Sequence, residues 1–343
     1  MGSIQPAESR TVNSMDRRTF MAAAGSSSAA CLASAGTGKN AQLGRQVLLV
    51  HLVGGPSQID TWDPKPDASI ECRGPFRSIP TRIPGVRLTE LFPHLADRLD
   101  RVCLVRTLHH NADPIHETGF RLLHTGCATD QTAAPVGSCV SGRGGVAPWV
   151  VVPGPISTLG QAAGVGQDGA IASGSWPIQL GAMSVDSMFS QAVGALEQGA
   201  RMVTVNTAET VFNRITWDCH ADLGALAGTL SDYRNHLAPA LDHGLARLID
   251  TLENKGLWDN VLLVVTGEMG RSPRLNSRGG RDHWTGAWTG LLAGAGVPRG
   301  VVVGSTDRDG AFPVENPVSL ERLHGLMGET LGLFGQTTKE IWS

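Results

Sequence analysis

The chain has 343 residues, enough to bury one large hydrophobic core or two modest ones, and its formal net charge is -3. This near-neutral balance gives no reason to expect nucleic acid or an acidic membrane surface as a partner. Its 43 glycines and its prolines cluster between apolar runs without a repeat period, which excludes collagen-like, coiled-coil and solenoid architectures. No residue pattern specifies an oligomeric state.

Residues 1–37 are typical of a twin-arginine export signal and its leader. The pair Arg17-Arg18 precedes Phe20, and a mild apolar run ends in the small-residue cleavage pattern Ala33-Ser34-Ala35. A disordered tail is the alternative interpretation. The run is too short to cross a bilayer, so no transmembrane span is expected. We therefore predict a periplasmic or extracellular protein with a single domain over residues 40–343.

Continuous apolar runs predict strands that are buried on both faces of a parallel sheet. In chain order they are Val47–Val53, Val102–Val105, Trp149–Val152, Met202–Val205, Val261–Val265 and Val301–Val303. Helices are predicted near Leu88–Leu99, Met188–Leu196, Leu237–Lys255 and Leu320–Leu331. Alternating strands and helices favour a doubly wound α/β sheet with helices on both faces, whose ligands bind at the carboxyl ends of the strands.

Polar residues follow the first predicted strand. Gly54-Gly55-Pro56 permits a tight turn, and Ser57, Asp60 and Asp63 lie in the loop beyond it. At the carboxyl end of a buried strand these side chains are candidates for a ligand site. The alternative is a turn in which the serine and the aspartates cap the backbone, and this segment alone does not distinguish the two.

A histidine-rich segment follows the second predicted strand. His109, His110, Asp113 and His116 fall within eight residues, which packing alone does not explain. Neutral imidazole is the commonest metal ligand and a competent acid or base, so these four residues are additional candidate ligands. A solvated polar loop is the alternative.

Asp218 and His220 flank Cys219 in a polar segment after the fourth predicted strand. In an extended chain successive side chains alternate, so the carboxylate and the imidazole would point to one side and the thiol to the other. A carboxylate beside an imidazole suits zinc or another first-row metal.

The apolar run Val261–Val265 leads directly into Glu268 and Arg271, and a glycine-rich stretch then delivers Asp282 and His283. Either Arg271 or the later Arg281 could hold an anionic substrate group through a bidentate contact, or neutralise a buried carboxylate. Oxygen and nitrogen donors of this kind predict a divalent ion, with zinc first and manganese, magnesium or calcium as alternatives.

Several catalytic motifs are absent from the sequence. It contains no G-x-S-x-G elbow, no G-x-x-x-x-G-K-[ST] loop and no H-E-x-x-H helix. A serine esterase of the α/β-hydrolase type, a P-loop NTPase and a zincin each need one of these. The sequence therefore argues against all three classes.

Taken together, the motifs resemble those of a known family. They occur in this order: the twin-arginine leader, Gly54 to Lys65, the histidine-rich segment, Trp217-Asp218-Cys219-His220, Gly267-Glu268-Met269-Gly270-Arg271, Gly280-Arg281-Asp282-His283-Trp284, and Gly304 to Pro313. This set resembles the bacterial family called domain of unknown function 1501, which is labelled sulfatase-like and is placed in the alkaline phosphatase superfamily. The resemblance covers nearly the whole mature chain. It implies an α/β/α sandwich with a mostly parallel central sheet and metals at its carboxyl edge.

The resemblance also implies a role for each candidate ligand. Asp218 and His220 resemble the superfamily's ligands of one metal, and His283 resembles its late histidine ligand, with Asp282 beside it. Glu268 stands where the superfamily has an Asp-His pair.

The first strand and the nucleophile depart from the superfamily pattern. That strand ends in His51 and not in a metal-binding aspartate, so Asp60 or Asp63 would have to replace it. In the superfamily one metal polarises the ester oxygen while another activates a nucleophile, for which Ser57 is the first candidate here and Thr118 the second. The formylglycine motif C-x-P-x-R is absent, which argues against a true sulfatase.

The sequence thus predicts an exported metal-dependent hydrolase that acts on a small anionic substrate, a phosphate or sulfate ester. In this prediction Ser57 and Arg271 are catalytic, and the acidic and imidazole side chains at the strand ends hold the metal. The alternative is an exported non-catalytic protein that keeps the fold and binds a metal or another ligand. A purely structural role for the Asp-His pairs, as buried ion pairs, is the third interpretation.

Overall fold

The computed structural model describes residues 44–334 except 131, 143–144, 157–182, 213, 223, 225 and 227. These residues belong to one compact unit, Gly38–Ser343. The predicted export signal lies outside the described residues. No helix among those described is long and apolar enough to cross a membrane.

The centre of the fold is an eight-stranded sheet with the order β11-β4-β10-β7-β1-β6-β5, in which β14 also pairs with β4. Its strands are β1 (Gln46–His51), β4 (Cys103–His109), β5 (Trp149–Val152), β6 (Met202–Asn206), β7 (Val261–Thr266), β10 (Trp288–Ala293), β11 (Val301–Val303) and β14 (Val318–Ser319). All paired neighbours are parallel except β10, which is antiparallel to both β4 and β7. The six strands predicted from apolar runs all form.

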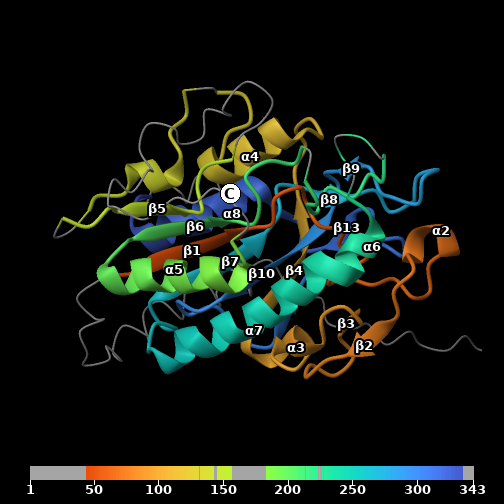
Figure 1. Ribbon diagram of the computed structural model, residues 1–343, viewed down its shortest axis with the longest axis horizontal. Helices are drawn as coiled ribbons and strands as arrows, with labels where there is room; N and C mark the ends of the chain where they lie inside the picture. The colour runs from red at the N-terminus through yellow and green to blue at the C-terminus, as the bar shows by residue number, and fades with distance from the viewer. Residues whose placement is uncertain are drawn as a thin grey trace, which may run out of the picture. The chain divides into compact units, whose positions relative to one another are not determined.

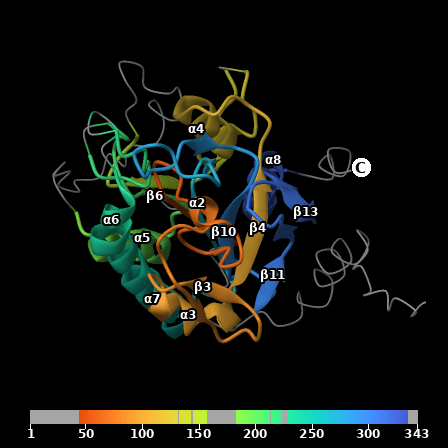
Figure 2. The same ribbon diagram turned by 90° about the vertical axis from the view of Figure 1, so that its right-hand side faces the viewer.

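Helices cover both faces of this sheet (Figures 1 and 2). On one face lie α3 (Pro93–Ala96), α5 (Val185–Gln198) and α7 (Ala238–Asn254), and on the other lie α4 (His116–Thr125) and α8 (Leu320–Leu331). The central strand β1 contributes alternate residues, Leu48 and Val50 to one core and Val47 and Leu49 to the other. The predicted α/β/α sandwich with a mostly parallel sheet is confirmed.

The remaining elements are short. They are α2 (Ile70–Arg73), β2 (Ser78–Pro80), β3 (Arg87–Thr89), η3 (Leu99–Arg101), η4 (Val136–Cys139), α6 (Leu230–Asp232), η5 (Tyr233–Leu237), β8 (Gly270–Arg271), β9 (His283–Trp284), β12 (Ser305–Thr306) and β13 (Pro313–Glu315). The strands β8 and β9 form an antiparallel pair beyond the edge of the main sheet.

Two sequence predictions differ from the fold. The helix predicted over Leu88–Leu99 is wrong, because this stretch contains the end of β3, the short helix α3 and the start of η3. Pro93 has no backbone N–H and stands at the first position of α3, so a longer helix cannot pass through it. The antiparallel strand β10 was not predicted, because Thr289 and Gly290 interrupt its apolar run.

The carboxylate of Asp242 joins α7 to the start of α3. It is buried and accepts hydrogen bonds from the backbone N–H groups of His94, at 2.9 Å, and Leu95, at 2.7 Å. These are N-terminal donors of a helix, which have no partner within the helix itself.

We expect Asp242→Ala to lower the free energy of unfolding by about 2–4 kcal/mol, because it leaves two buried N–H groups without acceptors. Asp250 on the same helix forms partly exposed ion pairs with Arg98 and Arg101, so Asp250→Ala should change stability by less than about 1 kcal/mol. Urea unfolding of the two variants measures the difference. Equal losses would contradict the assigned role of Asp242.

Candidate metal centre

The site lies where the central strands end. His51 at the end of β1 is in register with Asn206 at the end of β6 and with Thr266 at the end of β7. The three parallel strands therefore deliver their following loops to one edge of the sheet, where ligands of open α/β sheets bind. The loop after β6 carries Asp218, and the loop after β7 carries Glu268.

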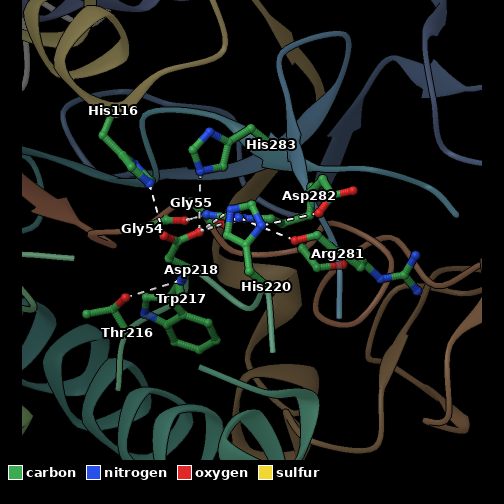
Figure 3. Close-up of polar contacts among 12 residues, drawn as sticks. Gly54, Gly55, His116, Thr216, Trp217, Asp218, His220, Arg281, Asp282 and His283 are labelled. Atoms are coloured by element: carbon green, nitrogen blue, oxygen red, sulfur yellow. Dashed lines mark hydrogen bonds and ion pairs between the residues drawn. The ribbon is translucent and has the colours of Figure 1, made fainter. Parts of the chain in front are cut away.

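Three imidazoles surround the buried carboxylate of Asp218 (Figure 3). His116 Nε2 lies 3.2 Å from Asp218 Oδ2, while His220 Nε2 and His283 Nε2 lie 3.1 Å and 3.4 Å from Oδ1. One ligand atom each from His116, Asp218 and His283 falls within 4.8 Å of the others. The predicted pair of Asp218 and His220 and the distant His283 are therefore brought together. His116, an additional candidate, joins them from the first turn of α4.

The other ring nitrogen of each imidazole contacts an oxygen. His116 Nδ1 lies 2.6 Å from Glu268 Oε1, His220 Nδ1 lies 3.2 Å from Asp282 Oδ1, and His283 Nδ1 donates to the carbonyl of Pro114 at 2.6 Å. A neutral imidazole that donates from Nδ1 keeps the lone pair on Nε2. All three Nε2 atoms point at Asp218, and in the neutral ring each would keep a lone pair for a metal there, in the arrangement by which proteins orient metal-binding histidines. Without a metal, His116 Nε2 instead donates to Asp218 Oδ2.

Arg271 approaches Asp218 from the interior. Its buried guanidinium pairs with Asp218 Oδ1, and it also donates to the carbonyls of Gly54 and, at 2.9 Å, Gly55. Burial alone would raise the pKa of Asp218, but Arg271 and the three histidines outweigh it and hold that pKa well below its usual range. The buried guanidinium thus contacts Asp218 and backbone carbonyls, as expected for the neutralising role that the sequence allowed.

Glu268 lies behind His116. Its Oε1 accepts from the backbone N–H of Gly54 at 3.0 Å and contacts His116, and its Oε2 contacts His51 Nε2 at 3.0 Å. Burial opposes ionisation, yet the hydrogen bonds to His116 and His51 lower the pKa of Glu268 to about 2. Burial likewise disfavours a charged His116, but Asp218 and Glu268 raise its pKa to about 9. Both oxygens of Glu268 are thus engaged by protein groups, and the residue supports His116 from behind.

Ser57, Asp60 and Asp63 take part in other interactions. The buried Ser57 hydroxyl donates to Asp60 Oδ2 at 2.6 Å, and the same carboxylate pairs with Arg281. Asp63 is buried against Lys65 at 3.0 Å and two further partners, Arg106 and Thr306. None of these three side chains belongs to the set of converging ligand atoms.

The other members of the histidine-rich segment also point elsewhere. His109 Nδ1 contacts the carbonyl of Thr107 at 3.1 Å, and the buried His110 packs its ring edge against Trp288, with ring centroids 5.7 Å apart. Asp113 is exposed. Asp282 contacts His220 Nδ1, the ring nitrogen that is not directed at Asp218, and is not one of the converging ligands.

Sequence reasoning gave no site role to His51 or Tyr233. His51 is a histidine at the end of a fully buried apolar strand, and such a position was itself a signal. Tyr233, the only tyrosine of the chain, is fully buried. Its hydroxyl donates to the carbonyl of Trp217 at 2.6 Å and accepts from the N–H of Ser57 at 3.1 Å. It thus joins the loop that carries Asp218 to the loop after β1.

Three buried atoms of the cluster have no partner in hydrogen-bond geometry among the described residues: Asp218 Oδ1, which forms an ion pair with Arg271, and the Nε2 atoms of His220 and His283. Each of the two imidazole nitrogens lies at ion-pair distance from Asp218 Oδ1, but neither contact has the geometry of a hydrogen bond. Buried polar atoms are normally satisfied, so their convergence calls for a shared partner. One oxygen and several imidazole nitrogens are donors that suit zinc and other first-row divalent ions, so the residues present fit a metal.

The profile of the family described as "Protein of unknown function (DUF1501)" matches residues 44–188 and 191–338. The chain belongs to this family. The match spans the histidine-rich segment and every residue of the cluster. A comparison of the sequence with curated proteins found no match.

Solved structures share the fold. A sulfatase from Pseudoalteromonas sp., PsFucS1, matches with a TM-score of 0.52 and 12% identity over 93% of this chain and 72% of that one. The phosphonate monoester hydrolase SpPMH from Silicibacter pomeroyi matches with a TM-score of 0.48 and 12% identity over 84% and 73%. At this identity the similarity concerns the fold: this chain shares its α/β/α sandwich with the Pseudoalteromonas sulfatase.

We expect Tyr233→Phe to lower the free energy of unfolding by about 2 kcal/mol, because the buried Trp217 carbonyl and Ser57 N–H each lose a partner while the ring still packs. Thr289→Val is the matched control, since its buried hydroxyl has no partner among the described residues. That variant should be neutral or slightly more stable. Chemical unfolding of both variants tests this. Equal changes in the free energy of unfolding would show that the hydrogen bonds of the tyrosine hydroxyl do not stabilise the fold.

Proposed function

We propose that this protein is an exported metal-dependent hydrolase of phosphate or sulfate esters. The observation that carries the proposal is the convergence of three oriented imidazoles on the buried carboxylate of Asp218. Each imidazole offers Nε2 to the centre because Nδ1 is held by Glu268, Asp282 or the Pro114 carbonyl. The arginine pair near residue 17 supports export by the twin-arginine route, which carries proteins already folded around a cofactor.

In this proposal His116, Asp218, His220 and His283 hold one divalent ion, with zinc as the first candidate because most donors are nitrogen. Among the described residues only one group of three or more potential ligands converges, so we expect one ion per chain. Such an ion supplies Lewis acidity toward the ester and lowers the pKa of water.

The protein residues position the reactants. His220 and His283 are partly exposed, with 14% and 20% of their side chains accessible, so the ester's anionic group can approach from their side. Arg271 keeps Asp218 ionised from the interior. In the hydrolysis, the oxygen of water bonds to phosphorus or sulfur, the bond to the alcohol oxygen breaks, and the proton released by the water ends on the departing alcohol.

The alternative is a non-catalytic exported protein that uses the same centre to bind a metal or ligand. It is favoured by the placement of the predicted catalytic residues. The Ser57 hydroxyl is buried and engaged with Asp60, and the Arg271 guanidinium is buried against Asp218. The buried Ser57 hydroxyl donates to Asp60, so in this proposal water is the nucleophile of an active enzyme.

Purified protein should contain about one equivalent of divalent metal, and His220→Ala or His283→Ala should remove most of it, because each deletes a nitrogen donor. His109→Ala is the matched control: its imidazole lies against the Thr107 carbonyl and is not one of the converging ligands, so the metal content should stay unchanged. Elemental analysis after dialysis measures the content. Folded wild-type protein that neither contains nor takes up a divalent ion would refute the centre.

A screen of phosphomonoesters, phosphodiesters and sulfate esters should reveal turnover by the metal-loaded protein. His283→Ala should reduce the rate by roughly a hundredfold or more, the usual cost of losing a positioned electrostatic group. His109→Ala should keep the wild-type rate. Stoichiometric metal without turnover of any of the three classes would favour the binding protein over the hydrolase.

A further inference from the structure

The carboxylate behind His220 is open to solvent. Asp282 Oδ1 lies 3.2 Å from His220 Nδ1, and 58% of the Asp282 side chain is accessible (Figure 3). Glu268, which stands behind His116 in the same way, is fully buried and is held by its surroundings. An exposed side chain changes rotamer freely unless another group fixes it. Asp282 therefore needs a partner of its own if it is to hold His220 in one orientation.

The side-chain amide of Asn276 is that partner. Its Nδ2 donates to Asp282 Oδ1 at 3.0 Å and to the carbonyl of His220 at 3.1 Å. An amide nitrogen has two protons to donate, one for each of these contacts. A single NH2 group thus contacts both the carboxylate behind the imidazole and the backbone of the residue that carries the imidazole.

The oxygen of the same amide is anchored by the backbone of the loop between β8 and β9. Asn276 Oδ1 accepts from the N–H groups of Arg278 and Gly280, each at 3.0 Å. Two backbone donors on the oxygen leave one orientation for the amide, with its nitrogen facing Asp282 and His220. The backbone N–H of Asn276 also donates to the Gly280 carbonyl at 2.8 Å. The amide is therefore fixed at both ends.

This loop lies directly on the segment that carries His220. A Cβ at Gly280 would stand 2.5 Å from the His220 carbonyl oxygen, which is closer than a real Cβ can come. The N–H of Arg281 donates to the Cys219 carbonyl at 2.9 Å. Because Gly280 has no side chain, the two segments approach closely enough for the Asn276 amide to reach the His220 carbonyl.

We propose that Asn276 is a positioning residue of the metal centre, which sets the orientation of the His220 imidazole through Asp282. The inference rests on the proposed function, in which His220 is a ligand. Asp282 accepts from Nδ1–H of that imidazole and so keeps the lone pair of Nε2 directed at the ion, and Asn276 keeps Asp282 in place. Groups that stand behind metal ligands typically contribute about 10–100-fold to metal affinity.

The test is a double-mutant cycle on the zinc affinity of the full-length protein, measured by competition with a chelator. Asn276→Ser should weaken zinc binding by about tenfold, because the amide that fixes Asp282 is lost. The serine hydroxyl can still accept from the N–H of Arg278, so the turn is kept. In an Asp282→Ala background the same substitution should change the affinity by less than about threefold, because the carboxylate that the amide holds is already gone.

Ser272→Ala is the matched control. The Ser272 hydroxyl accepts from the backbone N–H of Asp282 at 3.0 Å and donates to the Arg274 carbonyl at 2.9 Å, so it holds the backbone of the same loop. This variant should keep the wild-type zinc affinity. Urea unfolding without metal checks that both single variants are folded.

Two results would overturn the inference and leave the metal centre standing. One is zinc binding by Asn276→Ser that is as tight as that of Ser272→Ala. The other is an equal loss from Asn276→Ser with and without the Asp282 carboxylate, which would show that the amide acts on the loop alone. Folded wild-type protein that binds no zinc would instead overturn the zinc centre of the proposed function, and this inference with it.

Discussion

The buried carboxylate of Asp218 is the group on which the site depends. An ionised carboxylate in the protein interior costs several kcal/mol unless opposite charge and hydrogen bonds compensate it. Arg271 compensates it from the interior, and the imidazoles meet it from the side of the solvent. Because the same guanidinium donates to the carbonyls of Gly54 and Gly55, the charge pair also fixes the turn after β1 against the loop that carries Asp218.

Two glycines make these close approaches possible. Gly54 has a φ of +101°, and a Cβ at this position would meet the backbone nitrogen of Asp218 at 2.6 Å. A Cβ at Gly119 in α4 would meet the Glu268 carbonyl at 2.8 Å. Without a side chain there, the helix lies directly on the end of β7, and His116 in its first turn reaches the carboxylate of Glu268. The glycines thus bring together three segments that are distant in the sequence.

The fold could be predicted largely because burial on both faces leaves a pattern in the chain. Strands such as β1 and β7 read as unbroken apolar runs, since both faces of the sheet are covered by helices. The strand between β4 and β7 in the sheet left no such pattern. There β10 runs antiparallel and contains Gly290. A Cβ added to Gly290 would lie only 2.6 Å from the Leu108 side chain. A glycine required by close packing weakens the local strand signal, so tertiary packing and not propensity defines this strand.

The residue types of the site could be predicted from the sequence, but which of its side chains contact one another could not. Asp218 and His283 could be proposed from local chemistry, whereas the place of Glu268 depended on what stands at the end of β1. There His51, instead of an acid, hydrogen-bonds Glu268 and leaves both of its oxygens engaged within the protein. A carboxylate held in this way orients His116, and it already makes three contacts within the protein. In the proposed metal centre, Glu268 would therefore support the ligand His116 from behind and would not itself be a ligand.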